Sequence, residues 1–215
     1  MNKVLLYLLK AFLLLPVLFL LLLNAKAYYT PPCQVEPGSA WNTATIAQLQ
    51  YLRQQLEGGA AAEMQAIYPE GAVFTYALYG LAWADVLSHS SQNQKHYEMG
   101  LDALDRTMEF LLSEEARQPF SPELALTYGA FYQGWTSYLL GRKIQLTPPS
   151  DYDSVSVQVF KEKCQRITSA FTASDRPYLS SYSNGSWPAD NLLCLAALVL
   201  HDQLFPPIYQ SVIDS

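Results

Sequence analysis

The chain has 215 residues, and its 13 Lys and Arg against 19 Asp and Glu give a formal net charge of −6. An acidic chain of this kind is not expected to bind nucleic acid or an anionic membrane surface, because both carry negative charge themselves. The sequence has no C-x-x-C spacing, no HExxH, no phosphate-binding loop and no dinucleotide fingerprint, so we expect neither a metal nor a cofactor.

The first 27 residues predict an export signal. Lys3 and Lys10 precede an unbroken apolar stretch from Ala11 to Leu23, and Ala25-Lys26-Ala27 has the small-x-small form that signal peptidase accepts. An uncleaved anchor through residues 4–23 is the alternative, because about twenty apolar residues can span a bilayer. In both cases the rest of the chain is expected outside the cytoplasm, in the periplasm or secreted. Removal of residues 1–27 would leave ten basic against nineteen acidic residues, a net charge of −9.

Residues 28–40 are expected to form an extended, Pro-rich arm, and residues 41–215 a single domain of helical hairpins. The three cysteines of the chain allow one disulfide in an oxidising compartment. Cys33 in the arm could pair with Cys164, whereas Cys194 lies in an apolar helical stretch and is most simply a small core residue.

Apolar residues recur three and four positions apart in six segments of the domain, which predicts an all-α fold. Gly58-Gly59 is expected to end the first helix and Gly141 the fourth. Three of the segments are rich in Ala, Gly, Leu and aromatic residues, while two are amphipathic, a pattern typical of an inner helical layer covered by an outer one. The six predicted helices are 46–56, 73–87, 99–111, 124–140, 155–171 and 192–205, of which 73–87, 124–140 and 192–205 are expected to be inner.

Two of the inner segments also repeat. Residues 75–87 align without gaps to residues 127–139, with Thr, Tyr, Trp and Leu coinciding at an offset of 52. Trp83 and Trp135 should then occupy equivalent buried positions in successive hairpins. The period exceeds the ~34 residues of tetratricopeptide repeats and the ~40–47 of HEAT and armadillo repeats, and it suits the longer hairpins of α/α toroids.

Three short segments carry a resemblance to a known superfamily. Residues 68–71 (Tyr-Pro-Glu-Gly), Tyr128-Gly129 with Gly134-Trp135, and residues 185–191 (Gly-Ser-Trp-Pro-Ala-Asp-Asn) resemble the six-hairpin α/α-toroid superfamily, and within it the linalool dehydratase/isomerase-like group. The resemblance implies a partial (α/α) barrel, a pocket at one end of its inner helices, and activity on sugars or small apolar alcohols. Six predicted helices make about half of such a ring, so part of the family's catalytic set has no counterpart here.

The segment 185–191 has two interpretations. In the first it only starts a helix: Ser186 caps it, Pro188 opens it, and Asp190 in the first turn is favoured by the helix dipole. In the second it forms the mouth of a pocket, with Trp187 as a stacking wall and with Asp190 and Glu70 as a catalytic acid and base.

Further substrate-binding candidates follow from the aromatic composition of the inner helices. Tyr76, Tyr128, Tyr132 and Asn191 are candidates to contact a ligand, although aromatic stripes at helical spacing also occur in ordinary cores. Both Glu70 and Trp187 precede inner helices, so the N-terminal ends of these helices, with Tyr128, are expected to share one concavity.

The sequence thus leaves three functions open. The chain could be an exported hydrolase or lyase acting on a small-molecule or carbohydrate ligand, a non-catalytic helical-repeat binding module, or a truncated toroid without activity of its own. In the last case, self-association or a completing partner is expected at the C-terminal hairpin, Leu192 to Ile213.

Overall fold

The computed structural model describes residues 3–29, 42–90 and 96–214. The chain divides into two compact units, Met1–Gln34 and Val35–Ser215. Most of the expected arm at 28–40, including Cys33, lies outside the described residues. Of that arm, Tyr28 is the last residue of a helix and Tyr29 follows it.

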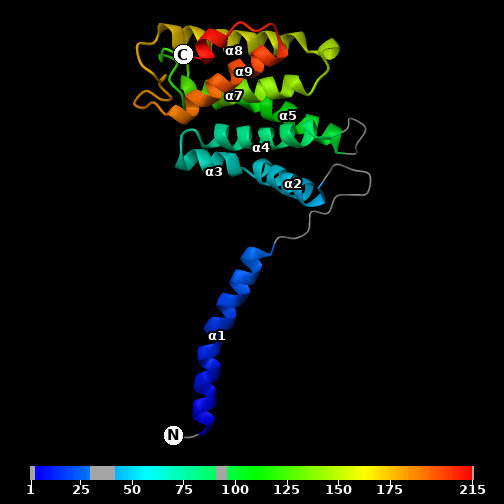
Figure 1. Ribbon diagram of the computed structural model, residues 1–215, viewed down its shortest axis with the longest axis vertical. Coiled ribbons are helices and arrows are strands. Elements are labelled where there is room, and N and C mark those ends of the chain that lie inside the picture. Colours follow the sequence, from blue (N-terminus) through cyan, green and yellow to red (C-terminus); the bar gives the residue numbers. More distant parts are fainter. Residues whose placement is uncertain (1–2, 30–41, 91–95, 215) are drawn as a thin grey trace. The chain divides into compact units, whose positions relative to one another are not determined.

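The first unit contains one described helix, α1 (Lys3–Tyr28), drawn in blue in Figure 1. Its apolar side chains between Phe12 and Leu23 are exposed to solvent, and the Ala25-Lys26-Ala27 motif lies near its C-terminal end. Among the residues that the structure describes, no helix combines the length and apolarity that crossing a membrane requires.

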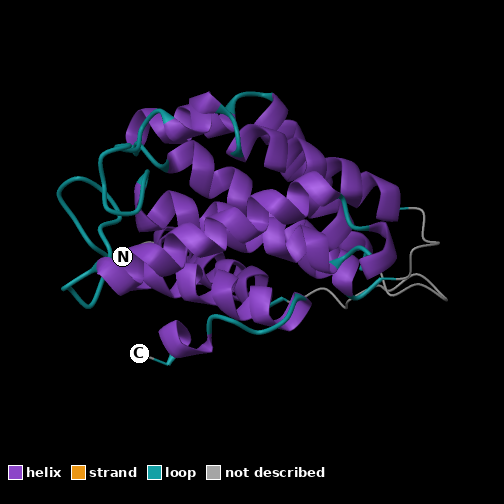
Figure 2. Cartoon of the chain, turned by 90° about the horizontal axis from the view of Figure 1, so that it is seen from above, coloured by secondary structure: helices purple, strands orange, loops and turns teal. Residues whose placement is uncertain are grey.

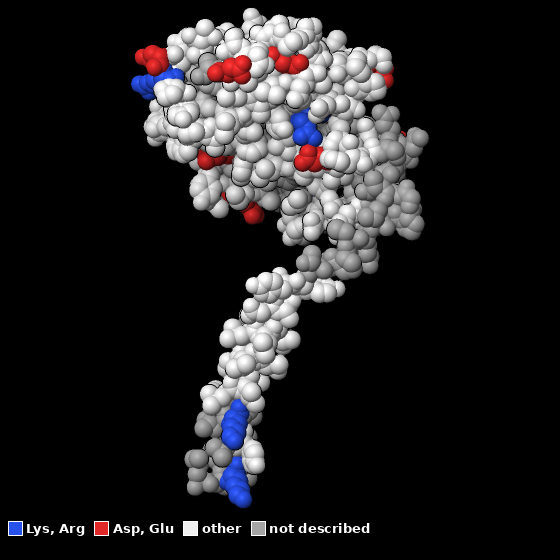
Figure 3. All heavy atoms as spheres, in the orientation of Figure 1, with Lys and Arg blue, Asp and Glu red and all other residues white. Residues whose placement is uncertain are grey.

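The second unit is all-α, as the sequence predicts, and residues 42–90 and 96–214 contain no β-strand. Figure 2 shows helices joined by loops, with the loops gathered near the helix ends. On the face drawn in Figure 3, carboxylates are scattered over this unit with few basic groups between them. Its helices are α2 (Thr43–Glu57), α3 (Ala60–Ile67), α4 (Gly71–Ser88), α5 (Tyr97–Leu111), α6 (Glu114–Arg117), α7 (Gly129–Gln145), the 3-10 turn η1 (Pro149–Asp151), α8 (Ser154–Ala173), α9 (Pro188–Leu204) and α10 (Gln210–Ile213).

Helix α7 lies at the centre of the second unit, between α9 and α4 (Figure 1). Helix α5 packs against both α4 and α7, and α8 packs against both α7 and α9. The three helices expected to be inner therefore lie side by side, and the two amphipathic helices cover them. Helices α2 and α3 pack against the remaining side of α4.

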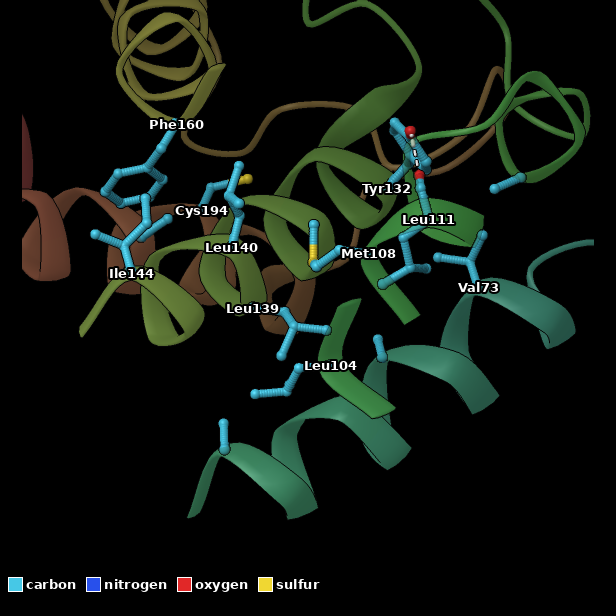
Figure 4. Packing of buried hydrophobic residues seen from close by; sticks show 14 of the residues in the cluster. Val73, Leu104, Met108, Leu111, Tyr132, Leu139, Leu140, Ile144, Phe160 and Cys194 are labelled. Atoms are coloured by element: carbon cyan, nitrogen blue, oxygen red, sulfur yellow. Dashed lines mark hydrogen bonds between the residues drawn. The ribbon is translucent and has the colours of Figure 1, made fainter. Parts of the chain in front are cut away.

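The core between α5 and α7 is drawn in Figure 4. Leu104 and Leu111 of α5 and Leu139 of α7 are fully buried, and the Tyr132 ring lies with them. The Tyr132 hydroxyl donates a hydrogen bond of 2.7 Å to the Leu111 carbonyl, so the one polar atom of this side chain is satisfied inside the core.

Gly141 does not end the fourth predicted helix, contrary to the expectation, because α7 continues to Gln145. A Cβ at position 141 would lie 2.7 Å from Cδ2 of Leu200 and 2.8 Å from Cζ of Phe160. Gly141 thus lets α8 and α9 approach α7 closely, and tertiary packing outweighs its low helix propensity.

The predicted start of the same helix at position 124 is also wrong, because α7 begins at Gly129. Tyr128 and Gly129 both have positive φ angles, 69° and 80°, so the chain turns sharply there. The Tyr128 N–H donates to the Ser121 carbonyl and the Ala130 N–H to the Ser180 carbonyl. The preceding loop at Ser121 and the distant loop at Ser180 therefore fix the first turn of α7, which local periodicity does not reveal.

The predicted repeat, which aligns residues 75–87 with residues 127–139, does not place equivalent positions at equivalent points of the two helices. Residues 75–87 lie entirely within α4, whereas Thr127 and Tyr128 precede α7. Trp83 is fully buried near Gly100 of α5, while Trp135 is only partly buried and meets Phe74 edge-on at 5.1 Å. The expected equivalence of the two indoles is wrong. The sequence patterns also missed α3 and the single turn of α6.

Candidate functional site

The N-terminal ends of α4, α7 and α9 open onto one cleft of about 700 Å³. Glu70 precedes α4, Phe131 lies in the first turn of α7, and Asp190 lies in the first turn of α9. The structure therefore brings Glu70, Trp187 and Asp190 to a common cleft. The other lining residues come from the loops before α4, α7 and α9: Pro69, Pro119, Phe120, Ser121, Tyr182, Ser183 and Asn184.

The start of α9 is built differently from the sequence expectation. Trp187, with extended backbone, is the N-cap residue and Pro188 occupies the first helical position, so the expected cap by Ser186 is wrong. The Trp187 N–H donates to the Ser181 hydroxyl at 3.2 Å. The hydroxyl of the buried Ser181 therefore satisfies this backbone donor. The hydrogen bond also holds the backbone of Trp187, from which the indole extends, at the mouth of the cleft.

The indole of Trp187 forms one wall of the cleft. Its side chain is 51% exposed, and its ring meets Tyr182 edge-on, with 5.5 Å between centroids and an interplanar angle of 82°. A large aromatic side chain held by its neighbours and still half open to solvent is suited to stack on a ligand.

Three aromatic rings from distant segments form the floor of the cleft. Phe120 stacks on Phe131 at 5.9 Å and on Tyr182 at 6.1 Å, and Phe131 and Tyr182 are 5.8 Å apart. Sequence analysis did not single out Phe120 or Tyr182. Both are isolated aromatic residues in polar loops, the same signal that pointed to Trp187, and it could have found them.

The titratable groups that line the cleft are the carboxyl groups of Glu70 and Asp190 and the phenol of Tyr182. Burial raises the pKa of Asp190, the Ser181 hydroxyl lowers it, and the nearby charge of Glu70 raises it further. Burial also raises the pKa of Tyr182, with added contributions from Glu70 and Asp190. Tyr182 therefore keeps its proton and can donate it in a hydrogen bond, and Asp190 stays protonated to a higher pH than an exposed aspartate.

Asn191, a predicted substrate-binding residue, lies behind the cleft. Its side chain is buried, and its Oδ1 accepts from the Leu179 N–H at 2.8 Å. Its Nδ2 donates to the carbonyls of Leu179 and Trp187, at 3.2 and 2.9 Å. The amide is thus occupied by the backbone, and Asn191 ties the loop that carries Trp187 to α9.

The remaining candidates lie elsewhere. Tyr128 and Tyr132 line a second cavity, of about 300 Å³, between α7 and α8. Tyr76 stacks on Phe110 at 4.1 Å and lines a third cavity, beside α2 and α5. Of the residues proposed from the sequence to contact a ligand, Trp187 is therefore the one that shares the cleft with Glu70 and Asp190.

The part of the chain that the structure describes holds no group of three or more His, Cys, Asp or Glu residues that could bind a metal ion. Cys164 and Cys194 are free thiols and fully buried. Comparison of this chain with protein families, with curated proteins and with solved structures finds no match.

Proposed function

We propose that this chain is an exported hydrolase or lyase that binds a carbohydrate-like ligand or a small alcohol in the cleft at the N-terminal ends of α4, α7 and α9. The observation that carries this proposal is that Glu70, Trp187 and Asp190 line one cleft. The export signal and the partial α/α toroid remain part of the proposal. They rest on the leader pattern and on the three short segments that resemble the toroid superfamily.

The chemistry of the lining favours a ligand with hydroxyl groups and an apolar face. Trp187 and Tyr182 offer ring surfaces for stacking, and the volume of about 700 Å³ is in the range of small-molecule sites. The carboxyl groups of Glu70 and Asp190 can accept hydrogen bonds from ligand hydroxyls, and the side-chain amide of Asn184 can both donate and accept.

The two carboxyl groups suit acid–base chemistry. A carboxyl group with a raised pKa, such as Asp190, can donate a proton to a leaving oxygen, which hydrolysis of a glycoside or elimination from an alcohol requires. Glu70, which precedes the first turn of α4, is then the base that takes a proton from water or from the substrate. Tyr182 stays protonated beside both groups and can orient either the ligand or Glu70.

A non-catalytic binding module is the second candidate. It is favoured by the position of Asp190 in the first turn of α9, where a carboxylate is stabilised by the helix dipole without any catalytic duty. In that case Trp187 still binds the ligand, but neither carboxyl group turns it over.

The proposed partial toroid also suggests an association surface. Leu192, Val199 and Ile208 are exposed large apolar side chains along α9 and the loop after it. A second copy or a completing subunit would cover them, as in a full ring. Light scattering of residues 28–215 tests this, and a monomer at all concentrations would contradict it.

Turnover assays separate the two candidate functions. Purified protein is incubated with a set of nitrophenyl glycosides and short unsaturated alcohols. Asp190→Asn and Glu70→Gln should each lower kcat at least roughly a hundredfold. Asp175→Asn, at an exposed position away from the cleft, is the matched control and should leave turnover unchanged. Ligand binding without turnover would favour the binding module, and turnover unaffected by both cleft substitutions would overturn the catalytic proposal.

A further inference from the structure

Helix α8 carries a buried lysine whose hydrogen bonds are fixed. Lys163 is 8% exposed, and its Nζ donates to Oε1 of Gln133 at 2.9 Å and to Oγ1 of Thr136 at 3.0 Å. Both oxygens must accept, because Gln133 Nε2 donates to the Thr127 carbonyl and the Thr136 hydroxyl donates to the Tyr132 carbonyl, each at 2.7 Å. The protein thus offers this nitrogen two acceptors.

No carboxylate compensates Lys163 within the described part of the chain, since none of the ion pairs there includes it. Burial, together with the charges of Arg166 and Arg117, lowers its pKa to about 7. The buried thiols of Cys164 and Cys194 cannot supply a counter-charge, because burial raises the pKa of both. A neutral amine fits the two acceptors, because it has two N–H groups and keeps one lone pair.

This nitrogen belongs to a residue that lines the second cavity, of about 300 Å³, between α7 and α8. The ring of Tyr132 lies 5.2 Å from Nζ. Arg117, Arg166 and the acidic Glu162 also line the cavity. Arg166 has Glu162 as a distant partner at 3.7 Å, whereas Arg117 lies over the Tyr128 ring and takes part in no ion pair of the described residues. Lys163 and an arginine without an ion-pair partner among the described residues therefore line one small cavity.

We propose that Lys163 forms an imine with a small 2-oxo acid in this cavity, whose carboxylate is held by Arg117. The lone pair of Nζ attacks the keto carbon, the C–N bond forms, and the carbonyl oxygen leaves as water with the two amine hydrogens. Arg117 suits the carboxylate because a guanidinium binds it through two parallel hydrogen bonds. The volume of about 300 Å³ admits a ligand of few heavy atoms.

This site is separate from the cleft at the helix ends, because the two have no lining residue in common. Tyr128 and Tyr132, which the sequence analysis singled out, both line this cavity together with Lys163. The imine site and the cleft can accordingly be tested independently.

Reductive trapping tests the proposal. The chain without its first 27 residues, residues 28–215, is incubated at pH 7 with pyruvate and sodium cyanoborohydride, and adducts are assigned by peptide mass spectrometry. Lys163 should be labelled at least roughly tenfold faster than Lys161, which is exposed on the same helix, because an ordinary lysine is almost fully protonated at this pH. The labelling rate should rise with pH around 7 and level off above it.

Two comparisons identify the role of the guanidinium. Labelling of the wild-type protein by pyruvate should exceed labelling by acetone, a neutral ketone of similar size, and Arg117→Met should remove that preference. Lys163→Met should lose the adduct while circular dichroism shows retained helices. Equal labelling of Lys163 and Lys161, or a rate that keeps rising towards pH 10, would overturn the proposal even if both variants fail to fold, because both outcomes are measured on the wild-type protein.

Discussion

Gly185 lies against the indole of Trp187 so closely that a Cβ at position 185 would stand 2.0 Å from Cζ3 and 2.4 Å from Cη2 of that ring. The backbone of Gly185 pairs with that of Tyr182 across a tight turn, so it cannot retreat freely. The glycine is therefore needed for the present position of the indole at the cleft, and any side chain there must displace the ring.

Gly185→Ala should displace Trp187 and lower the free energy of unfolding by about 1–3 kcal/mol, because the added methyl group overlaps the indole. Urea denaturation measures the stability, and near-ultraviolet circular dichroism reports the ring. Ser186→Ala, at the exposed neighbouring position, is the matched control and should change stability by less than about 0.5 kcal/mol. Equal stability and equal near-ultraviolet spectra for the two variants would show that the position of the indole does not depend on Gly185.

Substitution of two glycines with positive φ angles distinguishes the cost of backbone strain from the cost of steric overlap. Gly129 has φ +80°, and a Cβ there would lie 2.2 Å from the Ser181 carbonyl oxygen, whereas Gly59 has φ +100° and open space around it. Gly59→Ala should cost about 1–2 kcal/mol of stability, the strain of a left-handed residue. Gly129→Ala should cost about 3 kcal/mol or more, since it also separates α7 from the loop at Ser181. Equal costs in thermal or urea unfolding would show that the contact with Ser181 is not rigid.

The amphipathic periodicity of α2, α5 and α8 sufficed to place these helices from the sequence, because one apolar face against a core repeats with the helical turn. The start of α7 could not be placed that way. It depends on a hydrogen bond from Tyr128 to the preceding loop and on one from Ala130 to the distant loop at Ser180, and such contacts leave no periodic pattern.

Like the fold, the candidate site could be predicted only in part from the sequence. Trp187 and Asp190 were found because an indole and a carboxylate in a polar turn are unusual next to an apolar helix. The stack of Phe120 on Tyr182 was not found, because it joins two loops that only the packing of α7 and α9 brings together. Asn191 was expected to contact a ligand, and the sequence could not show that the backbone of Leu179 occupies its side-chain amide.

The stability of the protein should depend on pH through Lys163. Its pKa is lowered from 10.5 to about 7 in the fold, so between these values the unfolded chain binds more protons than the folded one, and stability rises with pH. Relative to Lys163→Met, the wild-type protein should gain about 2 kcal/mol between pH 7 and pH 9, and the difference should level off below about pH 6.

Urea denaturation at pH 6, 7, 8 and 9 measures this difference, with Lys161→Met as the exposed control that should show none. Higher pH is avoided because burial raises the pKa of Cys164 to about 12, so that its unfolded thiol ionises first and stability falls. Parallel stability curves for the wild-type protein and Lys163→Met would mean that the lysine keeps its ordinary pKa in the fold.

The most direct test of the account is a calorimetric titration of ligands into the cleft. The protein is titrated with a panel of mono- and disaccharides and short alcohols, and the tightest ligand is then titrated into Trp187→Ala and Tyr76→Ala. The account predicts that loss of the indole weakens binding by roughly tenfold or more, whereas loss of Tyr76, which lines a different cavity, leaves the Kd unchanged. A panel without any binding compound, or a Kd that Trp187→Ala does not change, would contradict the assignment of the cleft as the ligand site.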